Sequence, residues 1–168
     1  EQFDTQRLQT TRMKNKAITI CTMGLLYGTP AMAITDADTD KVLSAIRIVE
    51  SNNNPDAVGD SGNAIGVYQI WDSYWKDACT YSDNDDLRIS DGWDSCYDVE
   101  YADKVVHTYM KRYANEKRLG REVTMEDIAR IHNGGPRAVW AKGKKKKNLD
   151  AYWTKVKVVL NNKGVHLK

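Results

Sequence analysis

Apolar residues recur at helical spacing in several stretches of the chain. In residues 39–51 they follow the i, i+3, i+4, i+7 order of a helix with one buried face, at Val42, Ala45, Ile46 and Val49. Acidic side chains crowd the start of this stretch, at Asp36, Asp38 and Asp40, where negative charge stabilises a helix. The pattern therefore predicts a first helix over residues 39–51.

Helical signals return further along the chain. Residues 71–78 predict a short helix, and residues 95–115 predict a longer one with a continuous apolar face. Another helix is expected to begin at Thr124, because Thr124 and Asp127 have the spacing of a capping box. The Gly-Gly-Pro sequence of residues 134–136 predicts the end of that helix.

The last predicted helix carries apolar residues from Leu149 to Leu160, with Gly164 beyond its end. Residues 52–63 are rich in Asn, Gly, Asp and Ser, which favour turns. No long stretch alternates with period two, so at most a small sheet or hairpin is expected near residues 57–70. The chain therefore predicts one mostly helical domain of the α+β class.

The stretch Met13–Ala33 has the three parts of a secretory signal. It begins with the positive charges of Lys14 and Lys16, continues with an apolar segment too short to span a bilayer, and ends in an Ala-x-Ala cleavage site. Residues 1–12 fit no part of a signal and are interpreted as an upstream extension. We expect a mature domain of residues 34–168 that is secreted or periplasmic and has no integral membrane segment.

Cysteine usage fits this expectation. Cys21 leaves with the signal, so the mature chain keeps Cys79 and Cys96, which form one possible disulfide in an oxidising compartment. Two free thiols are the alternative. Two cysteines are too few for a closed zinc site, and no metal or organic cofactor is expected.

The net charge of +2 conceals a division of the chain. Residues 34–103 hold 4 Lys and Arg against 16 Asp and Glu, whereas residues 104–168 hold 17 against 5. This division does not indicate a nucleic-acid partner. The run Lys144–Lys147 is either a solvated loop or an attraction site for an anionic polymer.

Glu50 is the first candidate for catalysis. It follows Leu43 and Ile46 at helical spacing, so it lies beside the apolar face, and it stands at the C-terminal end of its helix. A carboxyl group in such surroundings keeps its proton more readily than one in water. It would suit a general acid that protonates a leaving oxygen.

The residues from Glu50 to Ile70 resemble the signature of the lysozyme-like superfamily, as found in goose-type lysozymes and soluble lytic transglycosylases. The matching elements are Glu50-Ser51, Asn54-Pro55-Asp56-Ala57, Gly62, Gly66 and Tyr68-Gln69-Ile70. A second and more particular resemblance is to the invertebrate-type, or destabilase-like, lysozymes. It is carried by GVYQIWDSYWKDAC (66–79), YMKRYA (109–114), IARIHNGGP (128–136) and YWTKV (152–156). The chain departs from the disulfide-rich pattern of that family, since its mature part has two cysteines.

The second resemblance covers about residues 40–157 and implies a lysozyme-like fold with a pair of carboxylates. It implies Glu50 as the acid and an aspartate about a dozen residues later as nucleophile or charge stabiliser. Asp60 matches best, because it lies in a polar loop between Gly59 and Gly62, and Asp56 is the competitor.

The resemblance also implies a set of sugar-binding residues. These are Tyr68, Gln69, His132, Asn133, Gly134 and Gly135, and Tyr152 is a further candidate that either stacks on a sugar ring or packs in the core. Trp71 and Trp93 are left open between sugar stacking and core packing, whereas Trp75 is assigned to the core. A serine hydrolase built on His132 is disfavoured, because the chain has no G-x-S-x-G motif.

These features predict a monomeric enzyme that hydrolyses the β-1,4 bond between N-acetylmuramic acid and N-acetylglucosamine in peptidoglycan. Two alternatives stay open. A lytic transglycosylase would lack the second carboxylate and leave 1,6-anhydro ends. A non-catalytic module would bind peptidoglycan without cutting it.

Overall fold

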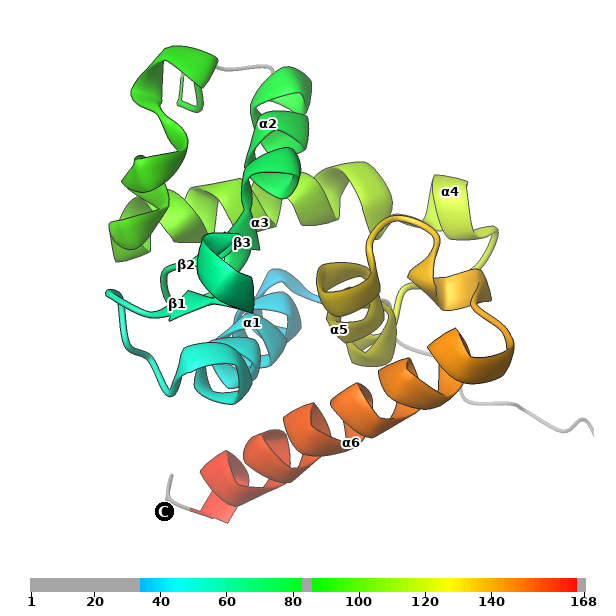
Figure 1. The fold of residues 1–168 in the computed structure, drawn as a ribbon. Helices are drawn as coiled ribbons and strands as arrows, with labels where there is room; N and C mark the ends of the chain where they lie inside the picture. Colours follow the sequence, from blue (N-terminus) through cyan, green and yellow to red (C-terminus); the bar gives the residue numbers. More distant parts are fainter. Residues whose placement is uncertain (1–33, 83–85, 166–168) are drawn as a thin grey trace, which may run out of the picture. The chain divides into compact units, whose positions relative to one another are not determined.

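The computed structural model describes residues 34–82 and 86–165, with side chains up to residue 162. The predicted signal sequence, Met13–Ala33, and residues 1–12 lie outside the described residues. The described helices are α1 (Asp36–Ser51), α2 (Asp72–Tyr81), α3 (Val99–Tyr113), α4 (Glu116–Leu119), α5 (Met125–Gly134) and α6 (Gly143–Val165). Short 3₁₀ turns connect several of them (Figure 1).

A small antiparallel sheet follows α1. Its strands are β1 (Val58–Gly59), β2 (Ala64–Ile65) and β3 (Ile70–Trp71), in the order β1-β2-β3. Val58 pairs with Ile65, and Ile65 pairs with Ile70. The expected mostly helical α+β fold with a small sheet is thus confirmed.

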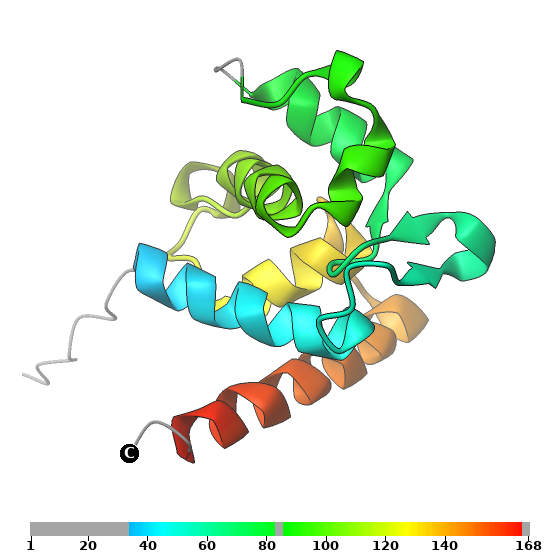
Figure 2. The same ribbon diagram turned by 90° about the vertical axis from the view of Figure 1, so that its left-hand side faces the viewer.

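The core lies among α1, α3, α5 and α6. Helices α1 and α5 lie between α3 and α6 in both views (Figures 1 and 2). The apolar faces predicted from spacing are buried, including Val42, Leu43, Ala45 and Ile46 of α1, Ile128, Ala129 and Ile131 of α5, and Leu149, Tyr152 and Val156 of α6. Burying each large aliphatic side chain contributes roughly 1.5–3 kcal/mol.

Side-chain caps fix the helix ends. The predicted capping box is present: Asp127 N–H donates to Thr124 Oγ1, and Thr124 N–H donates to Asp127 Oδ2. Asp127 is 3% exposed and receives two further hydrogen bonds from Arg121 at 2.6 and 2.7 Å. At the C-terminal end of α1, Asn52 takes a left-handed conformation (φ 55°), which turns the chain towards the sheet.

Helix α6 is longer than the sequence predicts. It begins at Gly143, so the run Lys144–Lys147 forms its first turn and is not a loop. It continues through Gly164, which was expected beyond its end. The apolar face that packs on α1 and α5 supplies the stability that the lysines and the glycine do not.

The helix predicted over residues 95–115 is divided. A 3₁₀ turn covers Trp93–Tyr97, and Asp98 then caps α3 by accepting a hydrogen bond from Tyr101 N–H at 2.8 Å. An aspartate that bonds the backbone in this way starts a new helix.

The predicted disulfide is not formed in the structure. Cys79 and Cys96 are free thiols in the core, 8% and 0% exposed. Burial raises the pKa of both thiols, in Cys96 to about 12, so both are protonated and behave as small apolar side chains. Within residues 34–82 and 86–165, no helix has the length and apolar character needed to cross a membrane.

Candidate active site

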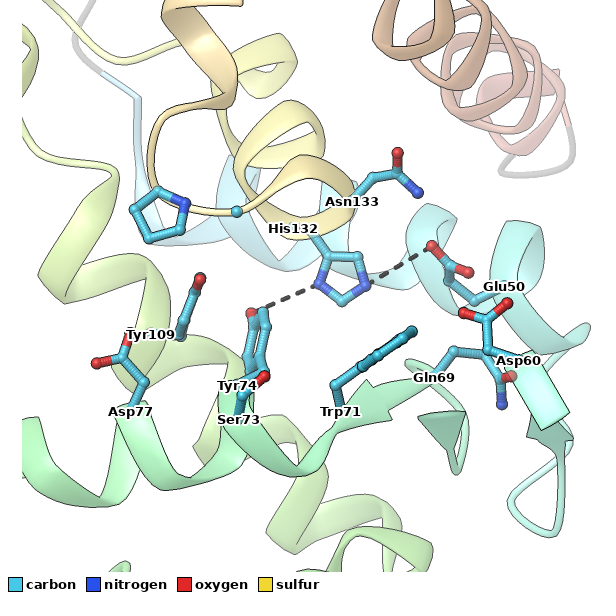
Figure 3. A pocket seen from close by; sticks show the side chains of 12 residues that line it. Glu50, Asp60, Gln69, Trp71, Ser73, Tyr74, Asp77, Tyr109, His132 and Asn133 are labelled. Carbon is cyan, nitrogen blue, oxygen red and sulfur yellow. Dashed lines mark hydrogen bonds and ion pairs between the residues drawn. The ribbon is translucent and has the colours of Figure 1, made fainter. Parts of the chain in front are cut away.

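A cavity of about 710 Å³ lies beside the C-terminal end of α1. Its walls come from α1, the β1–β2 connection, β3, α2, α3 and the end of α5 (Figure 3). The lining residues are Glu50, Asp60, Gln69, Trp71, Ser73, Tyr74, Asp77, Tyr109, His132, Asn133, Gly135 and Pro136. Residues far apart in sequence therefore share one pocket.

Glu50 is partly withdrawn from solvent, with 18% of its side chain exposed. Its Oε1 accepts a hydrogen bond from the Tyr152 hydroxyl at 2.6 Å and lies 3.7 Å from His132 Nε2. Burial and the Glu50 carboxyl raise the pKa of Tyr152 well above its ordinary value, so Tyr152 is the donor. Because Oε1 is held by Tyr152, Oε2 is the oxygen left to exchange a proton with a ligand.

The hydrogen bonds of His132 define its tautomer. Its Nε2 lies 3.1 Å from the carbonyl oxygen of Tyr68, which can only accept, so Nε2 carries the hydrogen. Nδ1 then accepts from the Tyr74 hydroxyl at 3.5 Å (Figure 3). Burial lowers the pKa of His132, although Glu50 opposes this effect, so the ring is neutral at pH 7.

Asp60 lines the same cavity as Glu50, and its side chain faces that of Glu50 (Figure 3). It is exposed and has a positive φ of 46°, in the 3₁₀ turn that joins β1 to β2. Asn63 fixes this turn by donating to the Asp60 carbonyl oxygen at 2.7 Å. Asp56, its competitor, is exposed in the preceding turn and is not among the lining residues.

Gln69 lines the cavity and also braces the sheet. Its Nε2 donates to the carbonyl oxygens of Ala57 and Gly66 at 3.1 and 3.0 Å. A Cβ on Gly59 would lie 2.1 Å from Gln69 Oε1, so the absence of a side chain at Gly59 leaves room for Gln69 in this position. Gln69 therefore positions the loop that carries Asp60.

Three residues expected to bind sugar have other roles. Tyr68 is 1% exposed and donates to Asp103 Oδ1 at 2.6 Å, so only its backbone carbonyl reaches the site, through His132. Tyr152 is 8% exposed and contacts Glu50. Gly134 packs against α6, where an added Cβ would lie 2.7 Å from Leu149 Cδ2.

His132, Asn133 and Gly135 do line the cavity. Gly135 has a φ of 78°, which ends α5 and exposes its backbone to the cleft. Among the tryptophans, Trp71 lines the cavity and is 47% exposed, whereas Trp75 is 3% exposed, as expected for a core residue. Trp93 is half-buried and donates to the Ile70 carbonyl oxygen.

The far wall of the cavity was not expected from the sequence. Ser73 and Asp77 lie one turn apart on α2, and Tyr74 stacks on Tyr109 at 3.6 Å between ring centroids. Arg112 Nη1 pairs with Asp77 Oδ1 at 2.7 Å and orients this carboxylate. The i, i+4 spacing of Ser73 and Asp77 was visible, but nothing in the sequence showed that this face meets α5.

The chain is similar to known lysozymes. The family model described as Destabilase matches residues 39–158. A lysozyme of Meretrix lusoria is 35% identical over 130 residues, covering 76% of this chain and 94% of the relative. Invertebrate-type lysozyme 6 of Caenorhabditis elegans is 33% identical over 135 residues, covering 79% of this chain and 94% of the relative.

A solved structure shows the same fold. One chain in the crystal structure of Aeromonas hydrophila PliI in complex with Meretrix lusoria lysozyme superimposes with a TM-score of 0.52 and 33% identity. The match covers 69% of this chain and 85% of that one. The family match and the two lysozyme relatives, each covered over 94% of its length, show that this chain belongs to the destabilase family of invertebrate-type lysozymes.

Proposed function

We propose that this destabilase-family enzyme is a muramidase that hydrolyses the β-1,4 bond between N-acetylmuramic acid and N-acetylglucosamine in peptidoglycan. The observation that carries the proposal is Glu50, a partly buried carboxyl group held by Tyr152 in a cavity that also contains Asp60. A glycosidase needs two carboxyl groups on opposite sides of one glycosidic bond.

In the proposed reaction, Glu50 Oε2 gives its proton to the glycosidic oxygen as the C1–O bond breaks, and the N-acetylglucosamine side leaves as an alcohol. Asp60 attacks C1 or stabilises the positive charge that develops there. Water then adds at C1 and returns a proton to Glu50. The exposed position of Asp60 suits this role, because its carboxylate is open to a substrate in the cavity.

Asn133 borders the cleft and would contact the glycan, as would Gln69, Gly135 and the exposed ring of Trp71, whereas the His132 side chain is 4% exposed and lies behind this surface. An aromatic face of this kind packs against the apolar face of a sugar ring. Tyr68, Tyr152 and Gly134 act behind this surface and hold it in place.

A lytic transglycosylase is the second candidate, because it would use Glu50 in the same way. The position of Asp60 in the Glu50 cavity favours the hydrolase, which needs a second carboxylate. Mass spectrometry of digested peptidoglycan tests this choice. The hydrolase predicts fragments with reducing N-acetylmuramic acid ends, and 1,6-anhydro ends would contradict it.

Export through the sequence Met13–Ala33 stays a prediction and fits a substrate outside the cytoplasmic membrane. Sequencing the N-terminus of the exported protein tests it, and Ile34 is the expected first residue.

A further inference from the structure

We propose that the outward face of α6 adsorbs the enzyme to a phosphate-bearing anionic polymer linked to the cell wall. This face is called the α6 basic face and consists of Lys144, Lys147 and Lys155. The proposal rests on the proposed action on peptidoglycan and adds a binding surface outside the cavity.

The three lysines share one side of the helix. They stand at i, i+3 and i+11, all exposed, and extend over roughly 16 Å of helix axis. Leu149, Tyr152 and Val156 occupy the buried side, which packs on α1 and α5. The basic face therefore points into solvent.

These lysines do not contribute to the stability of α6. Positive charges in the first turn oppose the helix dipole, and neighbouring lysines repel one another. Their neighbours do have partners: Lys145 Nζ donates to the Gly134 carbonyl oxygen at 2.9 Å, and Lys146 Nζ pairs with Asp150 Oδ2 at 2.7 Å. Among the described residues, none of the three lysines of the basic face forms an ion pair.

On α6 itself, lysines greatly outnumber acidic residues. Residues 142–157 contain seven lysines and one acidic residue, Asp150, whose carboxylate is already engaged by Arg130 and Lys146. A surface of one sign raises the local concentration of a polymer of the opposite sign, over a distance of about 8 Å at physiological ionic strength.

The burial of the apolar side of α6 favours a polymer over a membrane as the partner. A helix that lies in a lipid surface inserts a free apolar face. The apolar face of α6 is already buried against α1 and α5, so the exposed lysines offer charge without an inserting face. A flexible chain of phosphates matches such a surface.

The basic face is also close to the cleft. Lys145 contacts Gly134, and the next two residues, Gly135 and Pro136, line the cavity. A polymer attached to the wall and bound at the start of α6 would hold the cleft near wall glycan. Adsorption there would raise the rate on intact walls without changing the chemical step.

The test measures adsorption to purified walls before and after hydrofluoric acid extraction, which removes phosphate polymers. The K144Q/K147Q/K155Q variant is made in an E50Q background so that no wall is digested. At low ionic strength we expect its Kd for unextracted walls to rise about tenfold, and we expect no difference on extracted walls.

The matched control neutralises three exposed lysines outside α6: Lys41 of α1, and Lys104 and Lys111 of α3. It should adsorb like its parent. Equal losses in both triple variants, unchanged adsorption of the α6 variant, or tighter binding to anionic lipid vesicles than to walls would each overturn the proposal. Because adsorption is measured without digestion, a failure of the glycosidase assignment would leave this result intact.

Discussion

At the scale of single residues, two residues from distant parts of the chain lie beside the Glu50 carboxyl group. Tyr152 donates to Oε1 at 2.6 Å, and His132 Nε2 lies 3.7 Å from the same oxygen. The hydrogen bond from Tyr152 orients the carboxyl group and leaves Oε2 free for proton transfer, whereas neutral His132 gives its Nε2 hydrogen to the Tyr68 carbonyl oxygen. Tyr152 is therefore a positioning residue for the acid.

The first prediction concerns Tyr152→Phe, which removes the donor and keeps the ring. We expect kcat to fall about 10- to 100-fold with little change in KM, because Glu50 becomes charged as it gives up its proton and a hydrogen bond to a charged group contributes about 1.5–3 kcal/mol. Steady-state kinetics on soluble glycan fragments measures this. Tyr81→Phe, at a 40% exposed position, is the control. A rise in KM alone would instead make Tyr152 a sugar contact.

The second prediction concerns His132 and pH. Burial lowers its pKa below the ordinary value of 6.5, so the unfolded chain takes up a proton before the folded one does. The free energy of unfolding should therefore fall as pH drops from about 7 to about 5. Urea denaturation of His132→Gln, whose amide can still donate to the Tyr68 carbonyl, should show less of this loss than wild type.

His107→Gln is the control for this measurement, since His107 is half-exposed and pairs with Asp40 away from the cavity. It should not flatten the pH profile. If His107→Gln flattened the profile and His132→Gln did not, the neutral state assigned to His132 would be wrong.

At the scale of elements, α5 packs closely on α6 in the core and lines the cavity at its C-terminal end. Gly134 permits this approach, because a Cβ there would lie 2.7 Å from Leu149 Cδ2 and 2.9 Å from Ala138 Cβ. The same contact brings α6, and with it Tyr152, to the end of α1 where Glu50 lies.

Gly134→Ala is the third prediction. Overpacking costs about 1–3 kcal/mol, which exceeds the gain of up to about 1 kcal/mol from replacing a helical glycine. The free energy of unfolding should fall by about 1–2 kcal/mol in urea denaturation, while the KM of the folded enzyme stays as in wild type. An increased KM with unchanged stability would make Gly134 a substrate contact after all.

Elements with strong local signals could be predicted from the sequence. The Thr124–Asp127 capping box and the buried face of α1 are visible in the order of residues, and both are present. The start of α6 could not be predicted, because lysine-rich residues 144–147 have no local apolar pattern. Contacts with α1 and α5, which are remote in sequence, stabilise that helix.

In the candidate site, too, some residues could be predicted from the sequence, whereas contacts between distant segments could not. Glu50 and Asp60 lie close in sequence and were predicted together, and both line the cavity. Tyr68 was assigned to the cleft floor, but its hydroxyl group is buried on Asp103. Sequence cannot show which way a tyrosine points. Nor could it show that Asp77 of α2 faces the end of α5.

At the scale of the whole domain, the acidic and basic parts of the chain contribute different features. The acidic part, residues 34–103, supplies Glu50 and Asp60 to the cavity. The basic part, residues 104–168, supplies neutral His132 and Asn133 to the cavity and places Lys144–Lys147, Lys155 and Lys157 on α6. The chemistry and the proposed adsorption surface therefore belong to opposite halves of one chain.

The central claim is that Glu50 protonates the leaving oxygen, and the dependence of rate on the leaving group tests it most directly. Wild type and Glu50→Gln are compared on an N-acetylglucosamine oligomer and on the same oligomer with a dinitrophenyl leaving group, which departs without protonation. We predict that Glu50→Gln slows cleavage of the unmodified oligomer at least about 10²-fold and slows loss of dinitrophenol far less. Equal slowing of both substrates, or no slowing of the unmodified one, would contradict the assignment of Glu50 as the acid.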